Sequence, residues 1–476
     1  MGGVQVKWDG SRVTVAGLGV SGASAARALA GLGARVTVVD GGRGERQRAS
    51  AAELEADGVA VRLGDGTTLP DATELVVTSP GWQPESPLFT AAAEVGVEVI
   101  GDVELAWRLR GPGAAPWLAV TGTNGKTTTV QMLAEILRAE GLRAAAVGNV
   151  GTPVLDAVLA EEPYDVLAVE LSSYQLHWAP SLRPHSAAVL NLAPDHLDWH
   201  GSMAAYAADK GRIYQGNTIA CVYNAADPAT EELVRAADVE EGCRAVGFTL
   251  GAPGPSQLGV VDGLLVDRAF VPDRWRSAQE LAGADDVSPP APHNIANALA
   301  AAALARAYGV GPAAVRDGLR AFQPDAHRIA RVADVGGVSY VDDSKATNTH
   351  ATEASLASFD SIVWIAGGLA KGATFDGLVG GAAQRLRGVV LIGADRALIH
   401  ESLSRHAPEV PVVDLDRTDT GAMAAAVREA RALARPGDTV LLAPACASMD
   451  MFANYVRRGE AFAEAVRALE DGGAEE

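Results

Sequence analysis

A chain of 476 residues is too long for a single hydrophobic core of ordinary size, so two or three domains are expected. Hydrophobic residues make up 48% of it, and the net charge of −20 argues against nonspecific binding of nucleic acid and against an anionic membrane surface. No apolar run is long enough to span a membrane, no signal peptide is evident and the three cysteines lack metal-type spacing, so the expectation is a cytoplasmic protein.

Apolar, β-branched segments alternate with Ala- and Leu-rich helical segments from one end of the chain to the other. Helical patterns that end at glycine cover 23–33, 128–141 and 293–309. The expected strands are nearly apolar throughout, as parallel strands covered on both faces are. They lie at 12–17, 35–40, 74–80, 118–122, 165–172, 187–193, 361–368, 388–395 and 438–445. This alternation predicts the α/β class.

Two changes of composition divide the chain. The Gly-, Pro- and Ala-rich stretch 110–116 comes directly before a strand and a phosphate loop, and 322–328 follows the longest helical pattern. The Gly/Pro-rich segment 251–292 predicts a hairpin and loop excursion. Three α/β domains are therefore expected. They are an N-terminal Rossmann-like domain at 1–110, a central P-loop ATPase-like domain with a parallel sheet at 111–325, and a C-terminal Rossmann-like domain at 326–476.

A glycine-rich turn follows the first predicted strand. Gly17, Gly19 and Gly22 have G-x-G-x-x-G spacing before a helical pattern, and Asp40 closes the next strand. Such glycines let a diphosphate approach the N-terminus of a helix closely. Taken alone, the pattern suggests NAD, although the same geometry serves any nucleotide diphosphate and also occurs as a plain packing turn.

The segment AVTGTNGKTTT at 119–129 resembles a phosphate loop between a strand and a helix. Backbone N–H groups would hold phosphates, Lys126 would reach the β- and γ-oxygens, and the Thr127 hydroxyl would bind Mg²⁺. The segment departs from the strict form, because Val120 stands where the first glycine is usual and Gly122 comes later. Binding of a nucleotide triphosphate is still the favoured interpretation.

Two more predicted strands end in groups suited to chemistry. Glu170 closes the strand at 165–172, where NTPases place an acid that binds Mg²⁺ or orients water. Asp195 and His196 follow the strand at 187–193, at the carboxyl edge where α/β proteins bind ligands. A solvated or structural role for His196 stays open as the alternative.

Eight motifs occur in the order known from one family. They are TGTNGKTTT, ELSSYQL, NLAPDHLDWHGS, DKGRIY, HNIANALAA, DAHR, DDSKATN and PACASMDMF. Together they cover essentially the whole chain and resemble the Mur ligases, ATP-dependent amide-bond ligases that build the peptide stem of peptidoglycan. The combination of DDSKATN with PACASMDMFANYVRRG resembles the branch of this family that adds D-glutamate.

The resemblance implies a reaction and its partners. ATP would phosphorylate the carboxylate of UDP-N-acetylmuramoyl-L-alanine, and the D-glutamate amine would displace phosphate from the acyl phosphate, in peptidoglycan precursor synthesis. The implied cofactors are ATP, two Mg²⁺ ions and CO₂ held as a lysine carbamate. The expectation is a monomer without nucleic-acid or membrane partners. The N-terminal domain would bind UDP, the central domain ATP and the C-terminal domain the incoming amino acid.

The resemblance also implies roles for individual residues. The metal ligands would be Thr127, Glu170, His196 and carbamylated Lys210. The groups closest to the chemistry would be Lys126, Glu170, His196, Lys210 and Lys345. ATP would contact Gly122, Thr123, Asn124, Gly125, Lys126, Thr127, Thr128, Asn294, Asn297, Arg328 and Asp343. The UDP substrate would contact Val20, Ser21, Gly22, Asp40, Ser79, Pro80, Gly81, Asn149, Ser172 and Gln175. D-Glutamate would contact His327, Thr347, Lys371, Ser448 and Tyr455.

The choice of basic residue supports these assignments. The chain has only five lysines against 34 arginines, and all but Lys7 fall inside the motifs, as Lys126, Lys210, Lys345 and Lys371. The resemblance identifies Lys210 as the carbamylated residue. Carbamylation needs a neutral primary amine, and burial lowers the pKa of lysine from about 10.4, whereas a guanidinium stays protonated. Arginine would therefore not replace lysine there.

Other interpretations stay open at this point. Another Mur ligase or a folylpolyglutamate synthetase would share many of the motifs, although the latter lacks an N-terminal nucleotide-binding-type domain. A nicotinamide-dependent dehydrogenase would use the glycine turn, but it would leave the phosphate loop and Lys210 unexplained. A nucleotide-driven switch protein would bind the nucleotide without forming a bond.

Overall fold

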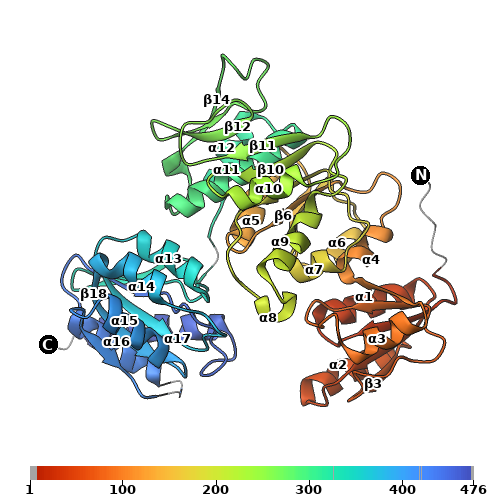
Figure 1. The fold of residues 1–476 in the computed structure, drawn as a ribbon, viewed down its shortest axis with the longest axis horizontal. Helices are drawn as coiled ribbons and strands as arrows, with labels where there is room; N and C mark the ends of the chain where they lie inside the picture. The colour runs from red at the N-terminus through yellow and green to blue at the C-terminus, as the bar shows by residue number, and fades with distance from the viewer. Residues whose placement is uncertain (1–7, 325, 418, 420, 473–476) are drawn as a thin grey trace. The chain divides into compact units, whose positions relative to one another are not determined.

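The computed structural model describes residues 8–324, 326–417, 419 and 421–472. The chain forms two compact units. The first unit runs to Pro290 and includes Asn294–Phe322, and the second holds Ala291–His293 together with the chain from Gln323 onward. The first unit contains two sheets and the second contains one, so the predicted α/β fold with three domains is confirmed (Figure 1).

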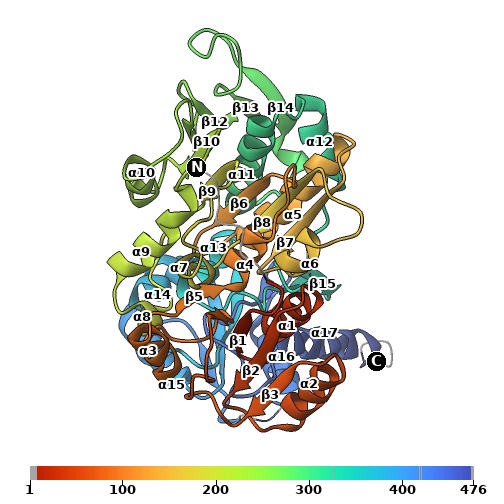
Figure 2. The same cartoon turned by 90° about the vertical axis from the view of Figure 1, so that its right-hand side faces the viewer.

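The N-terminal sheet has five parallel strands in the order β3-β2-β1-β4-β5. Figure 2 shows β1, β2 and β3 side by side in this sheet. The chain crosses from one side of β1 to the other between β3 and β4, which makes the predicted Rossmann-like arrangement with a switch point where ligands bind. Its elements are β1 (Arg12–Ala16), α1 (Val20–Gly31), β2 (Arg35–Asp40), α2 (Glu45–Ala56), β3 (Ala60–Leu63), β4 (Leu75–Thr78), α3 (Pro87–Glu94), β5 (Glu98–Gly101) and α4 (Asp102–Arg108).

The central sheet has nine strands in the order β14-β13-β12-β11-β10-β9-β6-β8-β7. The strands from β7 to β12 are parallel, and the hairpin excursion adds β13 and β14 in antiparallel fashion. The elements of its first half are β6 (Trp117–Thr121), α5 (Lys126–Ala139), β7 (Ala144–Gly148), α6 (Val154–Val158), β8 (Val166–Glu170), α7 (Ser173–His177), β9 (Ser186–Val189), α8 (Leu197–His200), α9 (Met203–Gly211) and η1 (Arg212–Tyr214). Those of its second half are β10 (Ala220–Asn224), α10 (Pro228–Arg235), β11 (Arg244–Phe248), β12 (Gln257–Val261), β13 (Leu264–Asp267), β14 (Gln279–Gly283), η2 (Ala284–Asp286), α11 (Pro292–Tyr308) and α12 (Pro312–Ala321).

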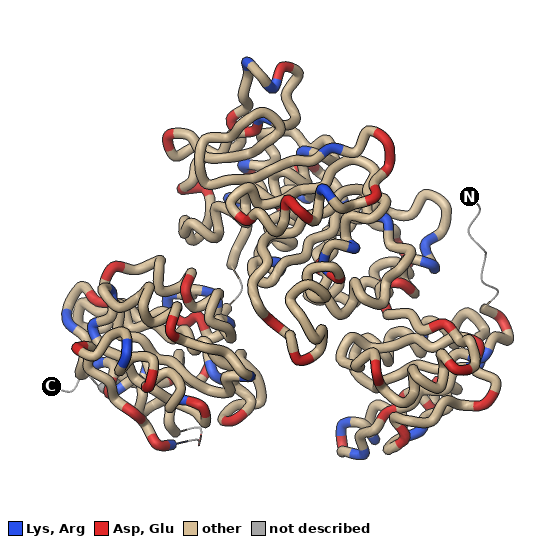
Figure 3. The backbone as a smooth tube through the Cα atoms, viewed as in Figure 1, with Lys and Arg blue, Asp and Glu red and all other residues tan. Residues whose placement is uncertain are grey.

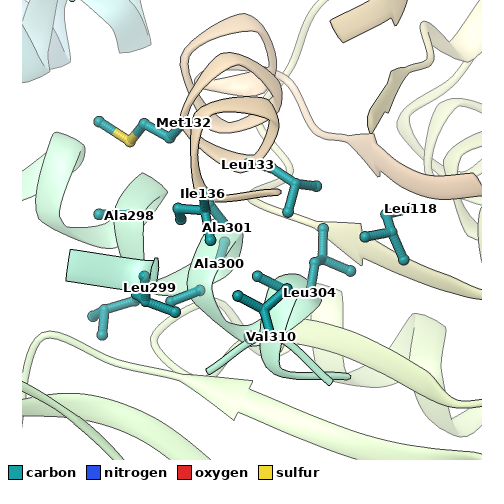
Figure 4. Close-up of a cluster of buried hydrophobic side chains, with 14 of the residues drawn as sticks. Leu118, Met132, Leu133, Ile136, Ala298, Leu299, Ala300, Ala301, Leu304 and Val310 are labelled. Carbon is teal, nitrogen blue, oxygen red and sulfur yellow. The ribbon is translucent and has the colours of Figure 1, made fainter. Parts of the chain in front are cut away.

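The helices α5, α11 and α12 pack together on the central sheet. Leu118 of β6 and Leu133 and Ile136 of α5 belong to one fully buried cluster with α11 (Figure 4). The buried residues of α11 from Ala298 to Ala305 are mostly alanine, which lets this helix approach its neighbours closely. A Cβ on Gly318 would overlap the backbone of Ile136, so α12 packs directly on α5. The helix that follows the phosphate loop is therefore held on several sides.

The C-terminal sheet has six strands in the order β15-β16-β20-β17-β18-β19. Only β15 is antiparallel to its neighbour, so the predicted Rossmann-like character of this domain is confirmed. Its elements are β15 (Ala330–Val335), β16 (Val338–Asp342), α13 (Thr349–Ala357), β17 (Ile362–Gly367), α14 (Asp376–Ala382), η3 (Ala383–Arg385), β18 (Leu386–Ile392), α15 (Arg396–His406), β19 (Val412–Asp414), α16 (Ala422–Leu433), β20 (Thr439–Leu442) and α17 (Tyr455–Gly472).

All nine strands expected from apolar runs are present. The domain boundaries at 110/111 and 325/326 stay predictions. Two residues named above, Lys7 and Asp325, lie outside the described residues. Within the described part of the chain, no helix has the length and apolar character needed to cross a bilayer. Acidic and basic residues are interspersed along both units (Figure 3).

Candidate active site

The phosphate loop connects β6 to α5 at the carboxyl edge of the central sheet. Gly122 has φ +152° and Gly125 has φ +83°, which are conformations that favour glycine. A Cβ on Gly125 would overlap the side-chain oxygen of Asn297, so the loop and α11 approach too closely for any larger residue. The helix α5 begins directly after Gly125, and backbone N–H groups at the start of a helix are suited to bind phosphate.

The loop is fixed to the segment that follows β9. The N–H of Asn124 donates to Oδ1 of Asn191 at 2.9 Å, and Nδ2 of Asn191 donates to the carbonyl of Asn124 at 3.1 Å. The hydroxyl of Thr123 accepts from the N–H of Ala193 at 3.0 Å and lies 3.0 Å from the hydroxyl of Tyr206. The loop conformation is therefore set by the protein itself.

Two lysines meet on one backbone carbonyl of this loop. Lys126 Nζ donates to the carbonyl of Gly122 at 2.9 Å and to that of Thr123 at 2.8 Å. Lys210 Nζ, from α9, donates to the same Gly122 carbonyl at 2.9 Å. Lys210 is only 2% exposed, and burial, reinforced by the charge of Lys126, lowers its pKa well below the ordinary value. A neutral amine is the form that attacks CO₂, so this environment suits the predicted carbamylation.

Glu170 closes β8 beside the strand that leads into the loop, with Val120 of β6 as its register partner. Its side chain is buried, and Oε1 accepts from Nδ2 of Asn149 at 2.9 Å. Oε2 is buried without a hydrogen-bond partner. A buried carboxylate oxygen in this state is costly unless a cation neutralises it, so Glu170 fits a Mg²⁺ site.

His196 lies directly before α8 with φ +54°. Its ring centroid is 4.9 Å from that of Tyr174, and Nε2 is 3.5 Å from Oδ2 of Asp195. Burial lowers its pKa, Asp195 opposes this, and the charges of Lys126 and Lys210 add to the lowering. A neutral imidazole is the form that binds metals, so this environment suits His196 as a metal ligand.

Thr127, buried in the first turn of α5, is the last member of the predicted ligand set. Among the residues that the structure describes, no three His, Cys, Asp or Glu side chains gather as a metal site. Glu170 and His196 are the predicted ligands of those types. A metal here would therefore also depend on the Thr127 hydroxyl and on carbamate oxygens at Lys210, a set of hard donors that suits Mg²⁺.

Asp209 was not predicted, although it anchors the helix that carries Lys210. This carboxylate is 6% exposed and is hydrogen-bonded to Nδ1 of His177 and to Nδ1 of His200, each at 3.0 Å. His200 also contacts the hydroxyl of Ser173 at 2.9 Å. The network joins α7, α8 and α9, and its one sequence signal was an acid directly before the motif lysine.

The glycine turn of the N-terminal domain packs against the end of β4. A Cβ on Gly17 would lie 2.9 Å from the Ser79 hydroxyl, and one on Gly22 would overlap the Gly17 carbonyl. Oδ2 of Asp40 accepts from the N–H of Leu18 at 2.7 Å. The Ser79 hydroxyl is buried without a hydrogen-bond partner, so it can serve a ligand. The other predicted residues next to this turn are Val20, Ser21, Pro80 and Gly81.

Asp102, also not predicted, connects this turn to the central domain. It is buried at the start of α4, burial raises its pKa, and the nearby side chains of Ser21 and Gln175 oppose that rise. Ser172 and Gln175 cap α7 reciprocally: the N–H of Gln175 donates to the Ser172 hydroxyl at 3.2 Å. Asn149 is held by Glu170 instead. The predicted substrate residues therefore connect to both the turn and the candidate metal site.

Of the remaining predicted nucleotide contacts, two lie near the loop. Asn297 abuts Gly125, and its Nδ2 donates to Oδ1 of Asn294 at 3.4 Å. Arg328 and Asp343 belong to the second unit. Asp343 is buried there, and burial raises its pKa to about 6.

The second unit gathers several of the residues predicted to bind D-glutamate. Lys345 Nζ lies 5.1 Å from the centre of the Tyr455 ring. The N–H of Lys345 donates to the carbonyl of His327 at 3.2 Å, and the N–H of Thr347 donates to the carbonyl of Lys345 at 2.8 Å. Nδ1 of His327 is 2.5 Å from Oδ2 of Asp342, which orients the imidazole.

The loops that carry Lys371 and Ser448 pair with each other. The N–H of Leu369 donates to the carbonyl of Ala447 at 2.9 Å, and the N–H of Ala447 donates back at 3.0 Å. Ser448 is buried, whereas Lys371 is exposed. Both loops therefore start from one fixed bridge at the carboxyl edge of the sheet.

Arg458 of α17 was missed by sequence reasoning. It is 1% exposed and donates to the hydroxyl of Ser344 at 3.0 Å, to the carbonyl of Ser344 at 2.8 Å and to the carbonyl of Cys446 at 3.1 Å. One buried guanidinium thus holds the segments that carry Lys345 and Ser448. The motif PACASMDMFANYVRRG contains this arginine, but nothing in its local pattern marks it as the one that turns inward.

Comparison with known proteins identifies the family. The MurD-like N-terminal domain of Mur ligases matches residues 11–101, the Mur ligase middle domain matches 120–305, and the Mur ligase glutamate ligase domain matches 327–446. Two relatives are named UDP-N-acetylmuramoylalanine–D-glutamate ligase. The one from Streptomyces avermitilis is 80% identical over 462 residues, which cover 97% of this chain and 99% of the relative. The one from Thermobifida fusca is 63% identical over 462 residues, with 97% and 99% covered.

Solved structures agree in fold at low sequence identity. UDP-N-acetylmuramate-alanine ligase MurC from Thermotoga maritima aligns with a TM-score of 0.57 at 18% identity, over 96% of this chain and 99% of that one. The MurF ligase from the same organism, in complex with ADP, aligns with a TM-score of 0.58 at 17% identity, over 92% and 95%. The nicotinamide-dependent dehydrogenase considered from the glycine turn is not supported. High identity over nearly the whole chain shows that this protein belongs to the Mur ligase family.

Proposed function

We propose that this protein is an ATP-dependent ligase that joins D-glutamate to UDP-N-acetylmuramoyl-L-alanine through an acyl phosphate. The names of its relatives support this reaction. One observation carries the proposal: Lys126 and Lys210 both donate hydrogen bonds to the Gly122 carbonyl. The charge of Glu170 also acts on Lys210. A triphosphate and a carboxylate repel each other, so their reaction needs the positive charge of Lys126 and of the Mg²⁺ ions that Glu170 and carbamylated Lys210 would hold.

Lys126 has a direct role in this proposal. Its ammonium group would leave the carbonyls of Gly122 and Thr123 and bind the β- and γ-phosphate oxygens of ATP. The backbone N–H groups at the start of α5 would bind the same phosphates. The loop would then orient the γ-phosphate toward the substrate carboxylate, because its own hydrogen bonds already fix its shape.

The residues present fit two Mg²⁺ ions. Thr127 and Glu170 would hold one at the β- and γ-phosphates, and His196 with carbamylated Lys210 would hold the other nearer the carboxylate. When bound, Mg²⁺ supplies the positive charge that stabilises the transferred phosphoryl group. The carbamate forms when the neutral Lys210 amine attacks the carbon of CO₂ and releases one proton.

The N-terminal domain would bind the UDP substrate, and the C-terminal domain would bind D-glutamate. The Ser79 hydroxyl and the turn ordered by Asp40 would bind the UDP part. Lys371, Ser448 and His327 would bind D-glutamate, whose neutral amine attacks the acyl carbon while phosphate leaves with the acyl-phosphate oxygen. A cytoplasmic location and a monomeric state stay predictions.

Phosphate release tests the proposal. Purified protein is given ATP, Mg²⁺ and UDP-N-acetylmuramoyl-L-alanine with one amino acid at a time from a panel of D- and L-forms, and the product is identified by mass. We expect sustained release with D-glutamate and only background release without an amino acid. Preference for another amino acid, or release that does not depend on the UDP substrate, would contradict the proposed specificity.

A further inference from the structure

Two cysteines of the central domain lie close together. Cys221 is the second residue of β10, Cys243 directly precedes β11, and their Sγ atoms are 3.9 Å apart. In the parallel register Cys221 is opposite Ala245, two residues after Cys243. Side chains two residues apart point to the same face of a sheet, so the thiols face each other for a structural reason. The third cysteine, Cys446, belongs to the second unit.

The two thiols differ in exposure and acidity. Cys221 is 2% exposed, whereas Cys243 is partly exposed after a turn at the surface. The contact with the Cys221 thiol lowers the pKa of Cys243, and partial burial opposes this. The same contact, together with burial, raises the pKa of Cys221. The pair therefore combines a partly exposed sulfur whose pKa is lowered with a buried thiol whose pKa is raised.

We propose that Cys221 and Cys243 are a redox-modification site that a hydroperoxide converts to a reversible disulfide. The Cys243 thiolate attacks one oxygen of the O–O bond, which breaks, and the other oxygen leaves with a proton as an alcohol or water. The Cys221 sulfur then attacks the sulfenic sulfur of Cys243, the S–O bond breaks, and the hydroxyl leaves as water with the Cys221 proton. Two thiols lose two electrons, and the hydroperoxide gains them.

The surrounding structure allows this bond to close. The sulfur atoms must approach from 3.9 Å to about 2.0 Å. Cys221 is fixed by hydrogen bonds of β10 to strands on both sides. Cys243 follows Gly242, which is exposed and has φ +91°, so the turn can supply the movement. The expected motion is thus of the turn toward the sheet.

The bond would enclose a segment that contacts the helix of Lys210. The residues between the two cysteines include α10, and its Leu233 packs against Gly211, the residue directly after Lys210. Cys221 also shares a buried cluster with Ile213 and Tyr214. The site is therefore a neighbour of the candidate active site, but the sulfur chemistry does not rest on the proposed ligase function.

Oxidation of the full-length protein tests the proposal directly. The reduced protein is treated with a small excess of tert-butyl hydroperoxide, remaining thiols are alkylated, and the digest is examined by mass spectrometry. We expect a peptide pair joined through Cys221 and Cys243, alkylated Cys446, and a fall in reactive thiols from three to one under denaturing conditions. Dithiothreitol should restore all three. Cys446 is the internal control, because burial raises its pKa to about 12.

Two variants separate the steps. In Cys221→Ser, a sulfenic-acid trap such as dimedone should label position 243, because no second thiol removes the hydroxyl. In Cys243→Ser, Cys221 should stay a thiol under the same treatment, and Cys446→Ser should form the disulfide like the wild type. Oxidation of Cys243 to sulfinic acid while Cys221 stays reduced, or oxidation of Cys446 as fast as Cys243, would overturn the proposal. Each result is read on sulfur atoms, whether or not the protein has ligase activity.

Discussion

Lysines of the central and C-terminal domains lie in opposite environments. Lys210 is 2% exposed and is held in α9 by hydrogen bonds to the Gly122 carbonyl and the Thr121 hydroxyl. Lys371 is exposed in a loop after β17, with φ +48°. Burial favours a neutral amine that can attack CO₂, whereas exposure suits a cation that binds a carboxylate from solution. One residue type can thus serve two chemistries, and solvent access separates them.

The largest expected effect is at the buried lysine. Lys210→Arg should lower the rate of phosphate release by about 10³-fold or more, because a guanidinium stays protonated and forms no carbamate. Added bicarbonate should not restore it, whereas Lys210→Ala should regain part of its activity with short-chain carboxylates. Circular dichroism and thermal unfolding would check that the fold persists. Wild-type turnover by the arginine variant would remove the distinction between the two lysines.

The second largest effect is expected at Glu170, the acid beside the phosphate loop. Glu170→Gln keeps the shape and an oxygen for Asn149 but removes the charge from the unpartnered side. We expect the Mg²⁺ concentration for half-maximal activity to rise by roughly 10–100-fold. Titration of activity with Mg²⁺ at saturating ATP measures this. Asn149→Ala serves as the matched control, since it removes the hydrogen bond and leaves the charge. An unchanged Mg²⁺ requirement in Glu170→Gln would exclude this carboxylate as a ligand.

Replacement by arginine should be tolerated at the exposed Lys371, although it is not at the buried Lys210. Lys371→Ala should raise the KM for D-glutamate by about tenfold or more, and Lys371→Arg should recover most of that loss, because either cation can bind a carboxylate. Initial rates at varied D-glutamate provide the measurement. If Lys371→Arg were as inactive as Lys210→Arg, the contrast between the two environments would be wrong.

The last expected effect is on stability rather than on activity. Burial raises the pKa of Asp343 from the ordinary 3.8 to about 6. Its protonated form is favoured in the folded state, so its contribution to stability is complete below about pH 4 and is lost as the pH rises through 6. Hydrogen exchange of the β16 amides should report a local loss on the order of 2 kcal/mol across this range. Asp343→Asn should abolish that pH dependence, and an unchanged slope would assign it to another group.

Strand prediction succeeded where a strand is covered on both faces. The central strands β1, β6 and β8 are mostly apolar, and each was expected. The strand β7 was not, because its sequence AAAVG is dominated by alanine, which favours helices in isolation. Tertiary pairing with β8 overrides that preference. Edge strands such as β3 were also missed, because exposed residues alternate along the strand and interrupt the apolar run.

Site prediction had a similar limit. The phosphate loop and the motif lysines are local patterns, so they could be found in the chain. Asp209, Asp102 and Arg458 act on partners from distant segments, such as His177 for Asp209 and Ser344 for Arg458. No local spacing predicts which of many Asp and Arg residues turns inward, because that choice depends on what the fold places opposite it.

The sequence by itself determined the α/β class, the phosphate loop and the placement of scarce lysines in motifs, because backbone propensity and residue chemistry are encoded locally. Only the tertiary structure decided which lysine loses contact with water, which oxygen of Glu170 is left without a partner, and which two of three thiols face each other. Those properties depend on desolvation and distance, and both arise only when remote segments pack together.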